Sequence, residues 1–310
     1  MIDGFPIPDL DFDDDDSEGV IGTPMAAIPS LSHSLTEEEY DALCVNNGLY
    51  LQSSTPLRCT SNSAVYAAFS DDDKKRYAVK ITEFKKRVKE EYFRRAKLGD
   101  SPFLVKSIAM VESPTKALLQ MELCESGDLT EYKLTEEVDV WKLIHDIGSG
   151  LLLLHESKLM HLDISPGNIL VSGEEDYNLP FFKLADFGTV LEVGSFSEGD
   201  EGAGPYVSPE ALAYPCGKYE VYEATDIFSF GVVLLEVITH QNAPRGGCEG
   251  YAKIRRDELF IGSNGYKPDL SSCSEELINL VNSMLSSDPG KRPTSADLVN
   301  ISKNVLGLEN

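Results

Sequence analysis

Hydrophobic and polar positions alternate in the first part of the chain and follow a helical period in the second. From Tyr50 to Ile81, the runs AVYAAF and YAVKI are separated by the polar turn SDDDKKR. Alternate side chains of a strand point to opposite faces, so this pattern predicts an antiparallel sheet. Beyond residue 135, positions suited to burial recur every three or four residues, which predicts a long helix. These positions are Trp141, Ile144, Gly148, Leu151 and His155. The sequence therefore predicts a β-rich first lobe and a mainly helical second lobe.

The N-terminal segment differs from the rest of the chain in charge. Residues 1 to 57 hold 12 acidic residues and no Lys or Arg, and residues 1–34 combine the run DLDFDDDD with several Gly and Pro residues. Such a composition buries too little apolar surface to offset the entropy of ordering, so we expect residues 1–34 to be an acidic disordered leader. A solvated leader is favoured over a docking or regulatory segment. Within residues 35–49, Thr36 followed by three glutamates predicts the N-cap of a short helix that flanks the first lobe.

Net charge and cysteine usage argue against several kinds of partner. The chain has 52 acidic and 27 basic residues, and its net charge of -25 repels the phosphates of nucleic acids and anionic lipid surfaces. No basic run precedes an apolar segment at the N-terminus, and the longest apolar stretch, 227–239, contains a glutamate. We therefore expect neither a nucleic acid nor a membrane partner. The six cysteines form no CxxC pair, which favours an intracellular, reducing environment without structural disulfides or zinc.

Two acidic motifs in the second lobe point to phosphoryl transfer. The segment HLDISPGNIL, 161–170, matches the pattern HxDxxxxN, with Asp163 in the base position and Asn168 five residues later. Further on, LADFG contains Asp186 in a DFG motif. Transfer of a phosphoryl group requires a carboxylate that orients the attacking hydroxyl and oxygen ligands that hold a hard cation such as Mg²⁺. Asp163, Asn168 and Asp186 together supply these oxygens.

A lysine and a glutamate upstream complete the expected set. The strand motif YAVK ends at Lys80, which should reach the α- and β-phosphates of ATP and pair with a helix glutamate. Glu90 and Glu91 are the candidates, 10 and 11 residues further on. Because a helix advances by about 100° per residue, Glu91 falls on the apolar stripe and Glu90 points away from it. The stripe consists of Phe84, Val88 and Leu98. We therefore expect Lys80 to pair with Glu91.

These motifs, in this order over residues 50–305, resemble the eukaryotic protein kinase domain. Downstream, SPE with Glu210 and DPGKRPT with Arg292 resemble the two halves of a buried structural ion pair in that family. The resemblance implies an α+β, two-lobed kinase fold with an N-lobe at 50–122 and a C-lobe at 125–305. It also implies transfer of the γ-phosphoryl group of ATP to a protein hydroxyl, with Asp163, Lys80 and Asn168 in catalysis and Asn168 and Asp186 on Mg²⁺.

The resemblance also implies a set of nucleotide contacts. In QMELC, Met121 takes the gatekeeper position, and Glu122 to Cys124 lie along the adenine edge, where the backbone makes the contacts. Val65 takes the position that caps the adenine. The implied ATP-binding residues are Arg58, Thr60, Ser63, Val65, Ala78, Lys80, Glu91, Met121, Glu122, Cys124 and Asp186.

Within the protein kinases, several stretches resemble the Wee-type cell-cycle kinases. They are KEEYFRRAKLG, LLQMELCESGDL, MHLDISPGNIL and SEGDEG, the last with an EGD triplet at 198–200. The resemblance implies a protein substrate, in particular a tyrosine of a cyclin-dependent kinase. For the compartment, nucleus and cytoplasm both stay open, and the resemblance implies the nucleus. An EGD triplet in an acidic protein can also be loop filler. A Ser/Thr-directed kinase stays open as an alternative.

The chain departs from the kinase pattern at the loop that covers the phosphates. The pattern GxGxxGxV falls on RCTSNSAV, so Arg58, Thr60 and Ser63 replace the three glycines. A side chain at these positions hinders close approach of the backbone to phosphate. Lys80 and Glu91 are also only 11 residues apart, which shortens the connection between strand and helix.

Three further departures concern charge. Ser165 stands where Ser/Thr kinases and the Wee family carry a lysine that contacts the γ-phosphate, and Ala203 replaces the threonine that partners this lysine. Leu162 replaces the arginine of HRD that clamps a phosphorylated activation loop, so phosphorylation of that loop should be dispensable. These losses keep a pseudokinase, a binding or scaffold module, as the alternative from another class. Because the base, the phosphate lysine and the metal residues are all retained, an active kinase is favoured.

Overall fold

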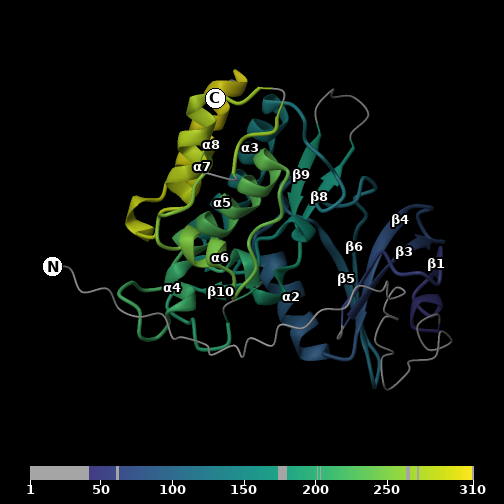
Figure 1. Cartoon of the computed structure of the whole chain (residues 1–310). Helices are drawn as coiled ribbons and strands as arrows, with labels where there is room; N and C mark the ends of the chain where they lie inside the picture. The colour runs from purple at the N-terminus through teal and green to yellow at the C-terminus, as the bar shows by residue number, and fades with distance from the viewer. Residues whose placement is uncertain are drawn as a thin grey trace, which may run out of the picture.

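The computed structural model of the chain describes residues 42–60, 63–173, 180–200, 202, 204–262, 266–270 and 272–308. The expected leader, the expected N-cap at Thr36 and the position of Ala203 lie outside the described residues. Residues 42–45 are helical and precede the first strand. Two lobes follow, a sheet with one helix and a larger helical body (Figure 1). The α+β, two-lobed fold predicted from the sequence is confirmed.

The N-lobe is built on an antiparallel sheet with the strand order β1-β3-β4-β6-β5, and β2 pairs with the outer part of β3. Buried and half-buried residues alternate along β3, as the alternating pattern predicts. Ala78 lies opposite Met121 and Lys80 lies opposite Leu119, so these positions share the face of the sheet that carries Lys80. The strands are β1 Leu49–Leu51, β2 Arg58–Cys59, β3 Ser63–Ser70, β4 Arg76–Thr82, β5 Ser107–Glu112 and β6 Ala117–Glu122.

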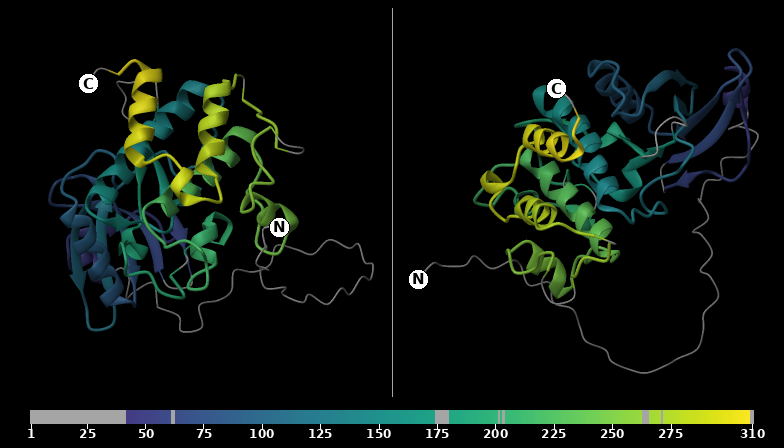
Figure 2. Two further views of the ribbon diagram at one scale, coloured as in Figure 1. Left: turned by 90° about the vertical axis from the view of Figure 1, so that its left-hand side faces the viewer. Right: turned by 90° about the horizontal axis from the view of Figure 1, so that it is seen from above.

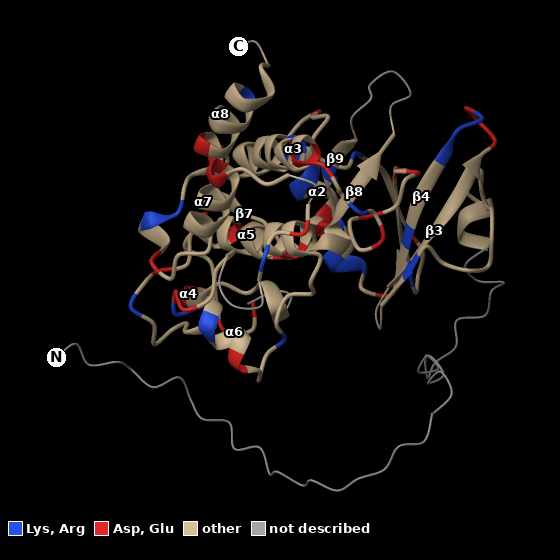
Figure 3. Ribbon diagram, turned by 45° about the horizontal axis from the view of Figure 1, so that its top comes forward, with Lys and Arg blue, Asp and Glu red and all other residues tan. Residues whose placement is uncertain are grey.

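The one long helix of the N-lobe, α2 (Lys85–Lys97), begins two residues after β4 ends. Its sequence holds seven basic and two acidic residues, so it is a basic element of an acidic protein (Figure 3). Val88 is buried against the sheet residues Ala117 and Leu119, which fixes the helix on the sheet. Phe84, which the helical stripe places beside Glu91, is instead the N-cap residue and is half-exposed, because the short connection leaves it outside the helix.

The C-lobe is organised around two buried helices, α3 (Glu137–Glu156) and α5 (Ala224–Thr239). All five positions of the predicted helical stripe lie on α3 and are buried, with His155 in its last turn. His155 donates or accepts hydrogen bonds with Ser295 and Asp226, so it is a satisfied structural residue. The remaining helices are α4 Pro209–Leu212, α6 Glu249–Ile254, α7 Glu275–Met284 and α8 Ser295–Leu306.

Short strands and single helical turns at the inner edge of the C-lobe carry the motif residues. Strands β8 (Ile169–Ser172) and β9 (Phe181–Leu184) pair antiparallel, and β7 (Leu159–Met160) pairs with β10 (Leu191–Glu192). Figure 2 shows the N-lobe sheet beside the helical body, and Leu184 of β9 forms a bridge with Leu104, which precedes β5. The single turns are η1 Pro166–Asn168, η2 Phe187–Thr189, η3 Gly204–Tyr206 and η4 Pro289–Lys291. The catalytic motifs therefore meet where the two lobes come together.

All six cysteines lie in the described part of the chain as free thiols. Among the described residues, no helix has both the length and the apolar character that a bilayer crossing requires.

Candidate active site

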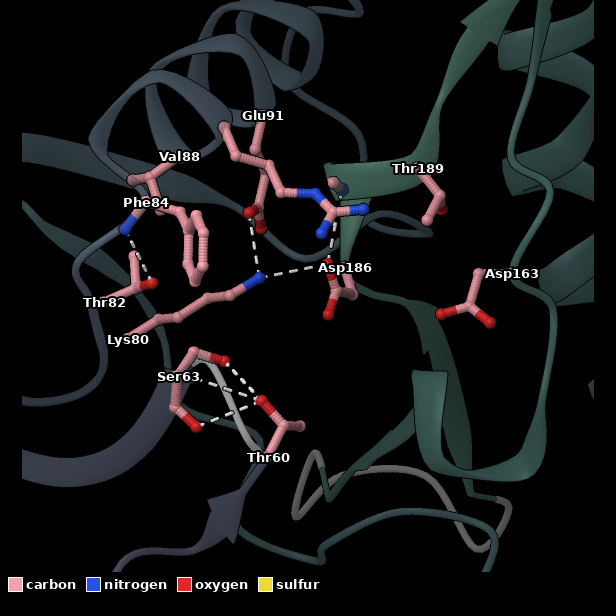
Figure 4. A pocket seen from close by; sticks show the side chains of 12 residues that line it. Thr60, Ser63, Lys80, Thr82, Phe84, Val88, Glu91, Asp163, Asp186 and Thr189 are labelled. Carbon is pink, nitrogen blue, oxygen red and sulfur yellow. Dashed lines mark hydrogen bonds and ion pairs between the residues drawn. The ribbon is translucent and has the colours of Figure 1, made fainter. Parts of the chain in front are cut away.

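A cleft between the lobes gathers the predicted phosphate and base residues. Side chains from the N-lobe sheet, from α2 and from the C-lobe motifs face one another across it (Figure 4). Sequence motifs did not predict that Arg87 lines the cleft, because its position depends on how α2 packs against the sheet. The lining residues are Thr60, Ser63, Lys80, Thr82, Phe84, Arg87, Val88, Glu91, Asp163, Asp186, Gly188 and Thr189.

Lys80 joins the two lobes through two ion pairs. Its Nζ lies 2.9 Å from Glu91 Oε2 on α2 and 3.1 Å from Asp186 Oδ1 in the C-lobe. Burial opposes the charge of the ammonium group, but the two carboxylates outweigh it and raise the pKa of Lys80 above its ordinary value. Lys80 is therefore a cation held at a fixed point in the cleft.

Glu91, and not Glu90, is the partner of Lys80. The Glu91 side chain is 2% exposed, whereas that of Glu90 is 44% exposed and lies near the cations of Lys86 and Arg94 on the outer side of α2. The helical advance of about 100° per residue explains why neighbouring glutamates point in different directions. Only two residues connect β4 to α2, yet this connection still brings Glu91 next to Lys80. The short spacing therefore does not prevent the ion pair.

Asp186 has the left-handed backbone conformation, with φ of 61°. Its Oδ1 accepts a hydrogen bond from the backbone N–H of Gly188 at 3.2 Å, which orients the carboxylate toward Lys80. Burial alone would favour the neutral acid, but the charge and hydrogen bond of Lys80 hold the pKa of Asp186 below its ordinary value. The carboxylate is therefore ionised and can serve as a ligand to a hard cation.

Asp163 and Asn168 are held together by the catalytic loop itself. Asn168 Nδ2 donates to the backbone carbonyl of Asp163 at 2.8 Å and to its Oδ2 at 2.7 Å. Burial raises the pKa of Asp163, and the nearby His161, Asn168 and Arg58 act in the opposite direction. Because both amide hydrogens point to Asp163, the Oδ1 atom of Asn168 faces the cleft. This arrangement fixes the direction of both side chains.

The set of donors fits a magnesium ion bound with nucleotide. Among the described residues, no three His, Cys, Asp or Glu side chains cluster as a self-sufficient metal site. Asp186 and Asn168 Oδ1 offer a carboxylate and an amide oxygen, and Mg²⁺ commonly takes one or two protein oxygens together with phosphate oxygens and water. The two residues are therefore suited to a metal that arrives with a triphosphate.

The buried carboxylate of Asp226, in the first turn of α5, binds the start of the catalytic loop. Its Oδ2 accepts from the backbone N–H of His161 at 2.8 Å, and its Oδ1 accepts from that of Leu162 at 2.8 Å. His155 Nε2 lies 3.0 Å from Oδ2. Burial disfavours the charge, but these donors hold the pKa of Asp226 below its ordinary value. The backbone at the start of the catalytic loop, at His161 and Leu162, is thus fixed by hydrogen bonds to Asp226.

We expect Asp226→Asn to destabilise the domain by about 1–3 kcal/mol, since the new amide group faces one of the two backbone donors and leaves it unpaired. Urea unfolding followed by circular dichroism measures this change. Asp269→Asn is the matched control, because the side chain of Asp269 is 74% exposed and its contact with His240 is 3.5 Å long. Equal stabilities of the two variants would contradict the anchoring role of Asp226.

Leu162 replaces charge with apolar packing at the position of the missing arginine. It has φ of 66° and is buried in a cluster whose other members lie in β7, the segment after β10, α4 and the loop before α5. These members are Met160, Phe196, Val207, Ala211 and Val221. The segment that follows the DFG motif is therefore held by hydrophobic contacts, and the dispensability of a phosphate there stays a prediction.

The segment in place of the glycine loop closes through hydroxyl groups. The backbone N–H of Thr60 donates to the carbonyl of Ser63 at 2.9 Å, and the N–H of Ser63 donates to Thr60 Oγ1 at 3.1 Å. Both side chains line the cleft opposite Lys80 (Figure 4). Thr60 and Ser63 thus bring polar side chains to the place where the kinase pattern has bare backbone.

Arg58, the third residue of the replaced pattern, reaches across the cleft. Its Nη1 donates to the carbonyl of Gly167 at 2.6 Å and to Asn168 Oδ1 at 2.8 Å. The structure therefore brings Arg58 to the catalytic loop. The kinase pattern placed Arg58 among the implied ATP-binding residues, but nothing in the motif indicated the direction of its side chain.

The expected adenine edge lies at the end of β6. Met121 pairs with Ala78 across the sheet. The carboxylate of Glu122 is occupied, because Oε2 lies 2.7 Å from Lys183 Nζ and Oε1 accepts from the backbone N–H of Lys106 at 2.7 Å. Burial raises the pKa of the Cys124 thiol to about 12, so this side chain is neutral. These side chains are therefore poor partners for adenine, and backbone contacts along residues 122–124 stay the prediction.

Comparison with known proteins gives a consistent picture. The model of the protein kinase domain matches residues 60–302. The chain is 30% identical over 250 residues to a membrane-associated tyrosine- and threonine-specific cdc2-inhibitory kinase of Drosophila melanogaster. This match covers 76% of this chain and 43% of the relative's length. It is 31% identical to a probable protein kinase of Dictyostelium discoideum, over 78% of this chain and 69% of the relative. The mitosis inhibitor protein kinase mik1 of Schizosaccharomyces pombe is 28% identical over 73% of this chain, which spans 40% of that relative.

Proposed function

The chain belongs to the protein kinase family, and from this premise we propose that it transfers the γ-phosphoryl group of ATP to a tyrosine of a cyclin-dependent kinase and so restrains mitosis. The observation that carries the phosphoryl transfer is the ion-paired arrangement of Lys80 with Glu91 and Asp186, at 2.9 and 3.1 Å. In family members this arrangement requires α2 and the DFG motif to be in place together. Both are in place in this structure.

Each residue of the cleft has a role in the proposed reaction. Lys80, held by Glu91, binds the α- and β-phosphates. Asp163 accepts the proton of the substrate hydroxyl and directs its oxygen toward the γ-phosphorus, while Asn168 keeps the Asp163 carboxylate in place. Asn168 Oδ1 and Asp186 would hold Mg²⁺, which when bound neutralises developing charge on the phosphates. Most of the catalytic effect then comes from position and charge.

Two observations support a tyrosine of a cyclin-dependent kinase as the target. The Drosophila relative is named as tyrosine- and threonine-specific and cdc2-inhibitory. The EGD triplet is an ordered turn, since the N–H and Oγ of Ser197 donate to Asp200 Oδ2 at 3.0 and 2.6 Å and Gly199 has φ of 98°. A built turn at this position favours a role in substrate binding over loop filler.

The substrate proposal is tested with a cyclin-dependent kinase bound to its cyclin, offered to the chain with ATP and Mg²⁺. Phosphotyrosine is expected, and a substrate whose target tyrosine is replaced by phenylalanine should lose most of the label. Strong phosphoserine or phosphothreonine without phosphotyrosine would overturn the choice of residue and leave the phosphoryl transfer standing.

A pseudokinase that binds partners without phosphoryl transfer is the second candidate. The contact between Arg58 Nη1 and Asn168 Oδ1 favours it, because a cation of the chain lies on an oxygen that the metal would use. Binding of nucleotide alone does not separate the two candidates. Turnover of ATP separates them, and the test compares the native chain with Asp163→Asn.

Lys80→Met is expected to weaken binding of Mg-ATP by about tenfold to a hundredfold, since hydrogen bonds to charged groups contribute about 1.5–3 kcal/mol. Isothermal titration calorimetry measures this affinity. Lys253→Met on α6 is the control, because Lys253 lies outside the cleft and pairs with Glu249 on the surface. An unchanged affinity in the Lys80 variant would show that the nucleotide binds elsewhere or not at all.

A further inference from the structure

Arg58 lies in the same row of the sheet as Lys80. In the register of the strands, Arg58 is opposite Val65, Val65 is opposite Lys80, and Lys80 is opposite Leu119. Residues directly opposite one another in a sheet project from the same face. Arg58 and Lys80 therefore flank Val65 on the cleft side, two strand spacings or about 10 Å apart.

The guanidinium group of Arg58 spans the cleft to the catalytic loop. Nη1 donates to the carbonyl of Gly167 at 2.6 Å and to Asn168 Oδ1 at 2.8 Å, across more than a hundred residues of sequence. To the described residues, Nε and Nη2 donate no hydrogen bond, so these donors stay available for a ligand. Arginine can bind phosphate through two parallel N–H groups.

Gly167 leaves room for this guanidinium. A Cβ atom at position 167 would lie 3.3 Å from both Nη atoms and 3.4 Å from Cζ of Arg58, closer than almost all real Cβ contacts. A side chain at residue 167 would therefore require the guanidinium group to shift by a few tenths of an ångström. The arginine at 58 and the glycine at 167 thus fit each other sterically.

The charge of the cleft explains why a further cation matters. Glu91 and Asp186 already pair with Lys80, and Asp163 adds a third carboxylate. Arg87 of α2 is the second cation of the lining.

Ser165, which is buried at the start of η1, carries no charge where a lysine would face the γ-phosphate. A triphosphate that enters this cleft therefore meets three carboxylates and two cations, and Arg58 would bring the number of cations level with that of the carboxylates.

We propose that Arg58 is a phosphate-binding residue of the nucleotide site and supplies the positive charge that Ser165 lacks. In the structure Arg58 rests on the oxygens of Gly167 and Asn168. With nucleotide bound, Arg58 would leave Asn168 Oδ1 to hold the metal and would turn its guanidinium donors to the phosphate oxygens. This inference rests on the proposed function, since it assigns a residue to the same nucleotide site.

Calorimetric titration with Mg-ATP and, separately, with adenosine tests the assignment. Arg58→Met should weaken binding of ATP by about tenfold to a hundredfold and leave that of adenosine unchanged, because only the triphosphate contacts the guanidinium. Arg58→Lys keeps the positive charge but loses the planar guanidinium group, so its ATP affinity should lie between those of the native chain and Arg58→Met. Arg76→Met is the matched control, since Arg76 is an exposed arginine of the same sheet that contacts Gln52 and Glu125.

A second arm restores the charge from the other side of the cleft. Adding Ser165→Lys to Arg58→Met should recover most of the lost ATP affinity. ATP affinity of Arg58→Met equal to that of the native chain would overturn the assignment, and a tighter affinity would show that Arg58 only obstructs the metal. If the native chain binds neither ATP nor adenosine, the proposed function fails and the role of Arg58 fails with it. Failure of Arg58 alone leaves ATP binding intact, so the two results are distinct.

Discussion

Asp163→Asn is expected to slow phosphoryl transfer by about 10²- to 10⁴-fold, which is the usual contribution of a positioned general base. The amide of the new residue cannot accept the proton of the substrate hydroxyl. In the native chain Asn168 Nδ2 lies 2.7 Å from Asp163 Oδ2. The amide oxygen of the new asparagine can accept the same hydrogen bond, so the loop should keep its shape. The loss should therefore appear in the chemical step, with little change in affinity for ATP.

Single-turnover consumption of ATP with Mg²⁺ and excess enzyme measures this step directly. Asp72→Asn, in the exposed turn between β3 and β4, is the control because it makes the same chemical change far from the cleft. Asp186→Asn should reduce both the rate and the affinity for Mg-ATP, since Asp186 also pairs with Lys80. If native chain and Asp163→Asn consume ATP at the same background rate, the pseudokinase is the correct alternative.

Features that depend on local pattern were predictable from the sequence. The alternation of residues in β3 and the helical stripe of α3 follow directly from side-chain periodicity. The choice of Glu91 over Glu90 followed from helical geometry alone, and the structure pairs Glu91 with Lys80. Residues fixed by their own element and by one neighbouring element can thus be placed from sequence.

Features that depend on the approach of distant segments were not predictable. The replaced pattern placed Arg58 among the implied ATP-binding residues, but it gave no sign that the side chain would reach Gly167 on the other lobe. Leu162 indicated only a lost charge, while its burial depends on Phe196 and Val207, which lie more than 30 residues further on. Phe84 fitted the apolar stripe but lies outside α2, because the end of a helix is set by its connection.

Removal of one half of the buried pair of Arg292 and Glu210 should cost about 3–5 kcal/mol of stability. The two side chains are 0% exposed, and Arg292 Nη1 and Nη2 lie 2.6 and 2.8 Å from the two carboxylate oxygens. Arg292 also donates to the carbonyls of Ala224 and Ser286, and Thr225 Oγ1 donates to Glu210. Arg292→Met leaves an unpaired carboxylate in the core at the start of α4.

Urea unfolding of Arg292→Met, Glu210→Met and the double variant separates the charge from the packing. Each single variant should lose several kcal/mol, whereas the double variant should lose less than the sum of the two, since no buried charge is left without a partner. Lys253→Met removes a cation from an exposed pair with Glu249 and should change stability by less than about 1 kcal/mol. Additive losses in the double variant would mean that Arg292 acts through its contacts with the carbonyls of Ala224 and Ser286, because those contacts are lost whether or not Glu210 is present.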